Sequence, residues 1–258
     1  MRINALLKAQ QAVDRAATRR WQSGIATLDG ALSGGLAYGR VHEVFAAEPA
    51  DSAATAGFAL AVATGMADGR SCLWLRSRRA AGLGGVLQAN GWSDLGGLPG
   101  RALCGILPDG IALLKAAVDA LRCAELGAVI IESRGSLREL DLTASRRLSL
   151  AAEKSGVPLL LLRVDATPSP SAAHTRWQVA AAPSQALPGN APGVPAFDLE
   201  LLRQKSGPSG LHWRLEWDRD QHRFRDATYI GAVVPVSARR QAADTGSRPL
   251  DQNVRRAA

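Results

Sequence analysis

Ten residues that follow a short predicted strand hold the position at which an α/β nucleotide-binding domain carries its phosphate-binding loop. The predicted buried strand is residues 41–45 (VHEVF), and the ten residues after it, 46–55, read AAEPADSAAT. A working loop reads G-x-x-x-x-G-K-[ST], because its glycines let backbone N–H groups converge on the phosphates while its lysine reaches the outer ones. The chemistry expected at this position is therefore phosphate binding, and the residues that perform it are missing.

The residue types within this segment work against a triphosphate. Ala46 stands at the first glycine position, Pro49 has no backbone N–H, and Ser52 falls near the lysine position. Glu48 and Asp51 add negative charge, and a like-charge contact near ~4 Å costs roughly 4 kcal/mol at an effective dielectric constant of about 20. We interpret the segment as a degenerate nucleotide site. From residues 23–45 alone, an ordinary loop and strand without such ancestry stays open as the alternative.

The composition is that of a globular protein. Of 258 residues, 47% are hydrophobic and 21% are charged, which allows one large domain with appendages or two small ones. No apolar run reaches the roughly 18 residues of a membrane span, and the N-terminus lacks the apolar core of a signal peptide. We therefore expect a cytoplasmic protein. The three cysteines are widely spaced and the four histidines show no ligand spacing, so we expect no disulfide framework and no metal site.

Positive charge is concentrated at the two ends of the chain. The formal net charge is +8, which favours contact with nucleic acid or with an acidic protein surface. Residues 1–22 predict a basic amphipathic helix that packs either on its own domain or on a partner. Residues 235–258 contain Arg239, Arg240 and Arg248 but almost no large apolar residue, so they predict a disordered basic tail, either solvated or bound to a partner.

Between these ends, residues 23–234 predict one α/β domain. Apolar strands without polar alternation, separated by helical stretches, are typical of a parallel sheet covered on both faces. The predicted strands are residues 41–45, 72–75, 128–131 and 157–164, and the predicted helices are residues 53–67, 111–126 and 142–155. Residues 165–196 carry six prolines and predict a long loop. Residues 197–201 and 211–217 alternate strictly on either side of a GPSG turn and predict an antiparallel hairpin.

The order of these segments resembles the RecA fold. Residues 27–40, TLDGALSGGLAYGR, match the lead-in T-L-D-x-A-L-x-x-G-G-L-x-x-G-R, and the likeness covers residues 23 to about 230. The resemblance implies an α/β core in which helices flank a mostly parallel central sheet, with a closing antiparallel hairpin and a degenerate P-loop. It also implies that Arg78 falls near the place of the catalytic glutamate. Only Glu132 remains, where an aspartate would coordinate magnesium, and one carboxylate without the loop cannot hold Mg-ATP. The alternative for Glu132 is a strand-end acid that makes an ion pair or a helix contact.

Among RecA relatives, the chain is similar to the ImuA family of damage-inducible mutagenesis proteins. Residues 145–148 (SRRL), residues 175–180 (TRWQVA) and the hairpin fit that family as well. The resemblance implies a protein without enzymatic activity or cofactor that acts in error-prone translesion DNA synthesis. Its implied partners are an ImuB-like homologue of the Y-family polymerases, an error-prone C-family DNA polymerase and RecA. Two other functions stay open: a divergent RecA-like ATPase or recombinase, and a cell-division inhibitor of the SulA type.

The RecA resemblance also places two candidate DNA-binding loops. RecA binds DNA through loops at the carboxyl edge of its sheet, and the equivalents here are residues 134–141 and the proline-rich segment up to residue 196. The candidate contacts with single-stranded DNA or a partner are Arg134, Arg138, His174, Arg176 and Trp177. An aromatic ring beside an arginine can stack on a base while the cation neutralises phosphate. In the alternative, Trp177 packs in the core and the arginines are solvated.

Overall fold

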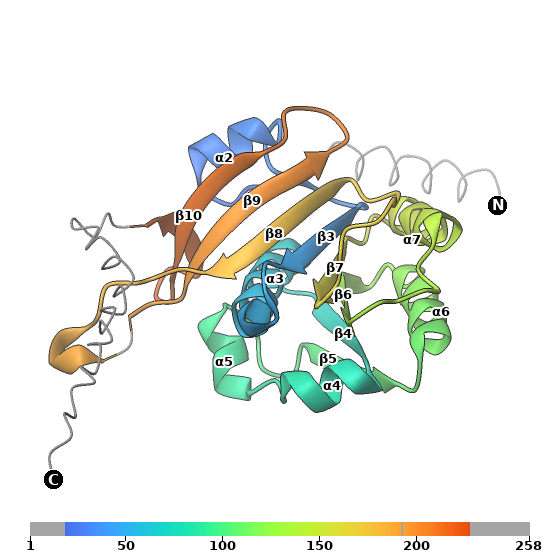
Figure 1. Cartoon of the computed structure of the whole chain (residues 1–258), viewed down its shortest axis with the longest axis horizontal. Coiled ribbons are helices and arrows are strands. Elements are labelled where there is room, and N and C mark those ends of the chain that lie inside the picture. The colour runs from blue at the N-terminus through green and yellow to red at the C-terminus, as the bar shows by residue number, and fades with distance from the viewer. Residues whose placement is uncertain (1–18, 192, 228–258) are drawn as a thin grey trace, which may run out of the picture. The chain divides into compact units, whose positions relative to one another are not determined.

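The structure is a computed structural model that describes residues 19–191 and 193–227 (Figure 1). The predicted basic tail, with Arg239, Arg240 and Arg248, lies outside the described residues, and so does most of the helix predicted over residues 1–22. The described end of that segment is not helical. β1 (Arg20–Trp21) pairs antiparallel with β2 (Leu36–Ala37).

A nine-stranded sheet organises the described residues (Figure 1). Its order is β11-β10-β9-β8-β3-β7-β6-β4-β5, with parallel neighbours from β8 to β5 and antiparallel neighbours from β8 to β11. The strands are β3 (Val41–Ala46), β4 (Ser71–Ser77), β5 (Ala102–Leu107), β6 (Leu126–Arg134), β7 (Leu159–Val164), β8 (Thr175–Ala181), β9 (Ala196–Gln204), β10 (Leu211–Asp218) and β11 (Arg223–Asp226). The predicted fold class, an α/β core with a mostly parallel sheet and a closing antiparallel hairpin, is confirmed.

Helices cover both faces of this sheet. α3 (Ser52–Ala67) packs on one face, whereas α6 (Gly110–Leu121) and α7 (Leu142–Ser155) pack together on the other. Asp109 and Asp141 cap α6 and α7, because each carboxylate accepts a hydrogen bond from the backbone N–H three residues later. The shorter elements are α2 (Ala26–Ala31), α4 (Arg78–Gly84), α5 (Ala89–Asp94) and the 3₁₀-helices Pro49–Asp51 and Pro188–Asn190.

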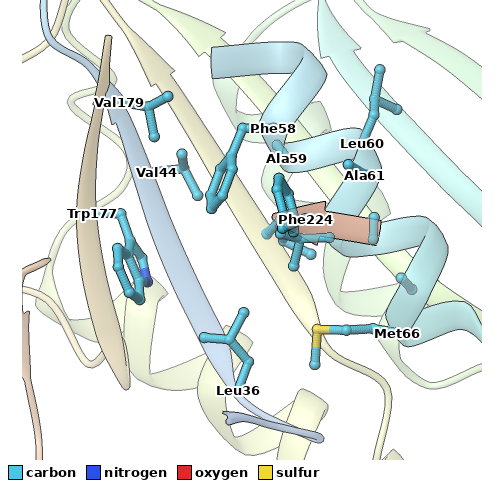
Figure 2. Packing of buried hydrophobic residues seen from close by; sticks show 14 of the residues in the cluster. Leu36, Val44, Phe58, Ala59, Leu60, Ala61, Met66, Trp177, Val179 and Phe224 are labelled. Carbon is cyan, nitrogen blue, oxygen red and sulfur yellow. The ribbon is translucent and has the colours of Figure 1, made fainter. Parts of the chain in front are cut away.

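The larger hydrophobic core lies between α3 and the middle of the sheet (Figure 2). Phe58 of α3 lies beside Phe197 and Phe224, with ring centroids 5.9 and 5.5 Å apart. Val44 and Trp177 belong to the same core from the sheet side (Figure 2). The 16 residues of α3 include no charged side chain. A helix that is apolar on all sides is stable only when it is buried. Packing against the sheet therefore holds α3, and with it the turn that joins α3 to β3, in place.

The prolines of residues 165–196 predicted one long loop, but the structure contains a strand within this segment. Thr175–Ala181 form β8, which pairs in parallel with β3 and antiparallel with β9. Thr175, Trp177 and Val179 are buried, while the residues between them are partly exposed. This alternation of β-branched and aromatic residues is a strand pattern, and none of the six prolines falls inside it. The loop prediction was wrong here because proline content outweighed a seven-residue pattern.

A buried histidine connects β3 to β8. His42 is 1% exposed, its Nδ1 lies 2.7 Å from Thr175 Oγ1, and its Nε2 lies 2.9 Å from the carbonyl oxygen of Ala37. A carbonyl oxygen can only accept, so Nε2 donates to Ala37 and Nδ1 of the neutral ring accepts from the threonine hydroxyl. Burial lowers the pKa of His42 from 6.5 to about 4.

The free energy of unfolding is expected to fall as the pH drops from about 6.5 to about 4, because the unfolded chain then takes up a proton at His42 and the folded chain does not. The loss of unfolding free energy reaches roughly 3 kcal/mol near pH ~4. Above pH ~6.5, protonation of His42 has no effect on stability. Because burial also lowers the pKa of His174 to about 4, urea unfolding of the His174→Gln variant at several pH values measures the contribution of His42. An imidazole NMR signal of His42 that titrates near its ordinary pKa would contradict the prediction.

Candidate functional site

The segment at the phosphate-loop position forms a closed turn. Between β3 and α3, the chain makes the 3₁₀-helix Pro49–Asp51. The Ala47 N–H donates to the carbonyl oxygen of Val179 at 2.9 Å, and the Glu48 N–H donates to Asp51 Oδ2 at 3.1 Å. Two backbone N–H groups that a phosphate loop would direct at its ligand are therefore already paired within the protein.

Asp51 fastens this turn to its surroundings. Its Oδ1 accepts from the Ala181 N–H at 2.8 Å, and its carbonyl oxygen accepts from Thr55 Oγ1 at 2.8 Å. Ala46 is buried at the end of β3, whereas Glu48 is exposed, and Ser52 begins α3. The carboxylate of Asp51 therefore has a structural role in joining α3 to β8. That the segment does not bind a triphosphate stays a prediction, which these contacts support.

Glu132, the remaining acidic residue of the degenerate site, is paired with a buried arginine. Glu132 lies on β6, and Arg76 is its register partner on β4. Arg76 Nε lies 2.7 Å from Glu132 Oε2 and Nη2 lies 3.2 Å from Oε1, and the two side chains are 7% and 4% exposed. The guanidinium also donates to the carbonyl oxygens of Ala80 at 3.1 Å and Gly85 at 2.6 Å. Each charge is therefore compensated inside the protein.

This pair changes what the acidic strand end can do. A magnesium ion would need the Glu132 oxygens as ligands, and both of them accept hydrogen bonds from the guanidinium. The alternative predicted for Glu132, an ion pair, is confirmed. Arg78, expected near the place of the catalytic glutamate, begins α4 and is exposed, and the side chain that reaches Glu132 is Arg76 instead. Within the described residues, no group of three or more His, Cys, Asp or Glu side chains could hold a metal ion.

The three candidate DNA contacts on and beside β8, His174, Arg176 and Trp177, do not have the exposed, cationic or stacking surfaces that contact with DNA requires. Trp177 is 2% exposed and its Nε1 donates to Thr175 Oγ1 at 2.9 Å, so the expectation that it stacks on a base is wrong. Arg176 pairs with Glu43 of β3 at 2.7 Å, and the two side chains are 11% and 2% exposed. Burial is the largest cause that lowers the pKa of His174 to about 4, so its ring is neutral near pH ~7 and does not neutralise phosphate.

The two other described candidates follow β6. Arg134 ends that strand, and its Nε is buried without a hydrogen-bond partner in the described part of the chain. Arg138 is exposed and lines a cavity of about 690 Å³. The segments that follow β3, β6 and β7 form the wall of this cavity, which therefore lies at the carboxyl edge of the parallel strands. Contact of Arg134 and Arg138 with DNA stays a prediction.

Three charged residues that the sequence interpretation did not single out lie within the parallel strands of the sheet. Glu43, Arg76 and Arg163 each interrupt an apolar strand, in the stretches VHEVF, CLWLR and LLLLR. All three are buried. A charged residue inside an apolar strand is itself a signal, because a buried charge requires compensation. Which residue compensates that charge depends on the order and register of the strands, and these cannot be read from the sequence of a single strand.

Comparisons with known proteins show similarity in sequence and in fold. The chain is 33% identical over 212 residues to Protein ImuA of Caulobacter vibrioides, in each of two strains, and the match covers 76% of this chain and 82% of the relative. In fold it is similar to the crystal structure of the RadB recombinase, with a TM-score of 0.52 and 14% identity, over 81% of this chain and 100% of that one. No protein-family model matches. In the described residues, no helix is long and apolar enough to cross a membrane.

Proposed function

This chain belongs to the ImuA family, and from that premise we propose that it is a non-catalytic accessory protein of damage-induced, error-prone translesion DNA synthesis. In this proposal the protein is a cytoplasmic adaptor that binds an ImuB-like homologue of the Y-family polymerases. RecA and an error-prone C-family DNA polymerase are the further proposed partners. Arg134 and Arg138 remain the described candidates for contact with single-stranded DNA, and no nucleotide cofactor is required.

The observation that carries the proposal is the buried pair of Arg76 and Glu132. An ATP-driven RecA-like protein requires a magnesium ion beside an acidic strand end, whereas here a guanidinium fixed by four hydrogen bonds stands next to that carboxylate. The closed turn around Pro49–Asp51 supports the same conclusion, because the N–H groups of Ala47, Glu48 and Asp51 are engaged within the fold. Such a scaffold can still present surfaces to partners without turnover.

An exposed apolar edge of the sheet supports contact with a protein partner. β5 is the outermost strand at one end of the sheet, so in the described residues one side of its backbone has no strand neighbour. Leu103 and Ile106 on β5 are 47% and 63% exposed, and Val86, earlier in the chain, is 82% exposed. An open edge strand can pair with a strand of another chain, while apolar side chains supply contact area. We therefore propose β5 as the docking edge for the ImuB-like partner.

Lysine substitutions on β5 are expected to weaken this docking. The double variant Leu103→Lys and Ile106→Lys should retain the ImuB-like partner at least about tenfold less than the unaltered chain, because charges on an edge strand oppose pairing with another strand. Copurification of the tagged full chain with that partner, with and without Mg-ATP, measures retention. Retention should be equal in the two conditions.

Leu150→Lys on α7 is the matched control, because Leu150 is 66% exposed and lies away from β5 on another element. This variant should retain the partner normally. Retention that requires Mg-ATP, together with magnesium-dependent ATP binding in equilibrium dialysis, would indicate a divergent RecA-like ATPase and would contradict the non-catalytic proposal. Normal retention by the β5 double variant would show that the partner docks elsewhere.

A further inference from the structure

A buried arginine on β7 is left without a hydrogen bond in the part of the chain that the structure describes. Arg163 is 4% exposed, and it makes no hydrogen bond or ion pair with any described residue. Its guanidinium lies against the ring of Phe45, with Cζ 5.6 Å from the ring centroid. Ser133, its register partner on β6, also has a buried hydroxyl without a hydrogen-bond partner in the described residues. A guanidinium carries five N–H donors and stays charged in proteins, so this part of the sheet has unused hydrogen-bonding capacity.

The buried charges around Arg163 do not cancel. Glu43, on the same face of the sheet, already pairs with Arg176 at 2.7 Å, and Arg176 Cζ lies 5.7 Å from the same Phe45 ring. Two guanidinium groups therefore share one carboxylate. Burial is the largest cause that lowers the pKa of Arg163, which reflects the same unfavourable environment for its charge. A buried charge in this state is stabilised by an anion that enters from outside.

Such an anion has a place to bind, because Arg163 lines the cavity of about 690 Å³ at the carboxyl edge of the parallel strands. Sites for small molecules have volumes of roughly 300–1,000 Å³. Ser136, Thr167 and Ser169 line the same cavity and can supply hydroxyl donors, and exposed Arg138 adds a second guanidinium. The cavity therefore combines a buried cation with further donors in a space of suitable size.

We propose that this cavity binds one compact oxyanion, a phosphate or carboxylate group of a small molecule, with the Arg163 guanidinium as its principal donor. The cavity shares a wall with the degenerate nucleotide site, because Ala46, Glu48 and Pro49 also line it, but the proposed principal donor comes from β7. Arg163 lies on the face of the sheet that α6 and α7 cover, together with Leu161, whereas the phosphate-loop segment leads into α3 on the other face. The proposal goes beyond the adaptor function and does not depend on it.

Carboxylates on the same wall favour a small oxyanion over a nucleic acid strand. Glu48, Asp141 and Asp165 line the cavity beside its two arginines, so negative side chains outnumber positive ones. A continuous row of phosphates would pass close to these carboxylates and be repelled. A single oxyanion can be bound at the guanidinium without such contacts.

Isothermal titration calorimetry of the full chain with inorganic phosphate and with succinate, at constant ionic strength in chloride buffer, tests the site and distinguishes the two groups. Binding of either anion to the unaltered chain is expected, and Arg163→Met should weaken it at least about tenfold, because a charge-assisted bidentate contact is lost. In buffer without the anion, the melting temperature of Arg163→Met should equal or exceed that of the unaltered chain, because the substitution removes a buried charge that shares the Glu43 carboxylate with Arg176.

Arg146→Gln is the matched control, because Arg146 is exposed on α7 and does not line the cavity; it should bind as the unaltered chain does. The absence of binding by both anions, or equal affinity in Arg163→Met, would overturn the proposal. So would displacement of bound phosphate by oligothymidylate, which would assign the cavity to DNA. If Arg163→Met does not fold, Arg163→Lys decides, because the loss of the planar donor pair should still weaken binding and an unchanged affinity would exclude the site.

Discussion

Replacement of Arg76 by methionine is expected to lower the free energy of unfolding by roughly 3–5 kcal/mol, because it leaves the Glu132 carboxylate buried without its partner. The two side chains are 7% and 4% exposed and share two short contacts, of 2.7 and 3.2 Å. The carbonyl oxygens of Ala80 and Gly85 would also lose their donor. Urea unfolding near pH ~7, with the midpoint and slope compared between variants, measures the loss.

A double variant separates the cost of an unpaired charge from the contribution of the pair. Arg76→Met combined with Glu132→Leu should restore stability to within about 1 kcal/mol of the unaltered chain, because no charge is then left buried. Arg122→Met is the control, since Arg122 and its partner Asp119 are each 70% exposed, and its effect should stay within about 0.5 kcal/mol. A loss below about 1 kcal/mol in Arg76→Met alone would contradict the assignment of this pair as a buried one.

Trp177→Ala is expected to destabilise the protein by roughly 3–5 kcal/mol, because it opens a cavity in the larger core. Trp177 is 2% exposed, contacts the ring of Trp213 with centroids 5.9 Å apart, and donates to Thr175 Oγ1. The threonine hydroxyl also bonds His42, so the truncation removes one member of a buried polar chain. Chemical unfolding monitored by far-UV circular dichroism measures the loss.

Trp213→Ala is the comparison for this prediction, because Trp213 is only partly buried. It should cost clearly less than Trp177→Ala. If the two substitutions had equal and small effects on unfolding while Trp177→Ala abolished binding to single-stranded DNA, the base-stacking role would have to be restored and the buried position of Trp177 rejected.

The sequence predicts most of the sheet, because most strands have an apolar or alternating residue pattern of their own. Residues 128–131 are continuously apolar, and residues 41–45 and 157–164 are mostly apolar, because helices cover both faces of the strands they form. The hairpin of β9 and β10 follows from strict alternation on either side of a GPSG turn. β5 was not predicted, because ALCGIL is short and lies at the sheet edge, where its side chains are partly exposed. β8 was missed because prolines surround it on both sides.

The candidate site was harder to predict than the fold. Glu132 follows from its position at the end of an apolar strand, but its partner Arg76 is 56 residues away in the chain, and Glu43 is 133 residues from Arg176. These pairs exist because the strand order places β4 beside β6 and β3 beside β8. A pattern within one strand contains no information on which strand will lie next to it, so the buried charges could be noticed but not paired.

The position of β3 between β7 and β8 has a consequence for synthesis on the ribosome. β3 ends at Ala46, while its neighbours begin at Leu159 and Thr175, so neither exists when β3 leaves the exit tunnel. At a translation rate of about 5–20 residues per second, both edges of this apolar strand wait several seconds for their hydrogen-bonding partners. The central strand of the finished sheet is therefore, in the nascent chain, a segment whose unpaired edges are open to association with other chains until its neighbours are synthesised.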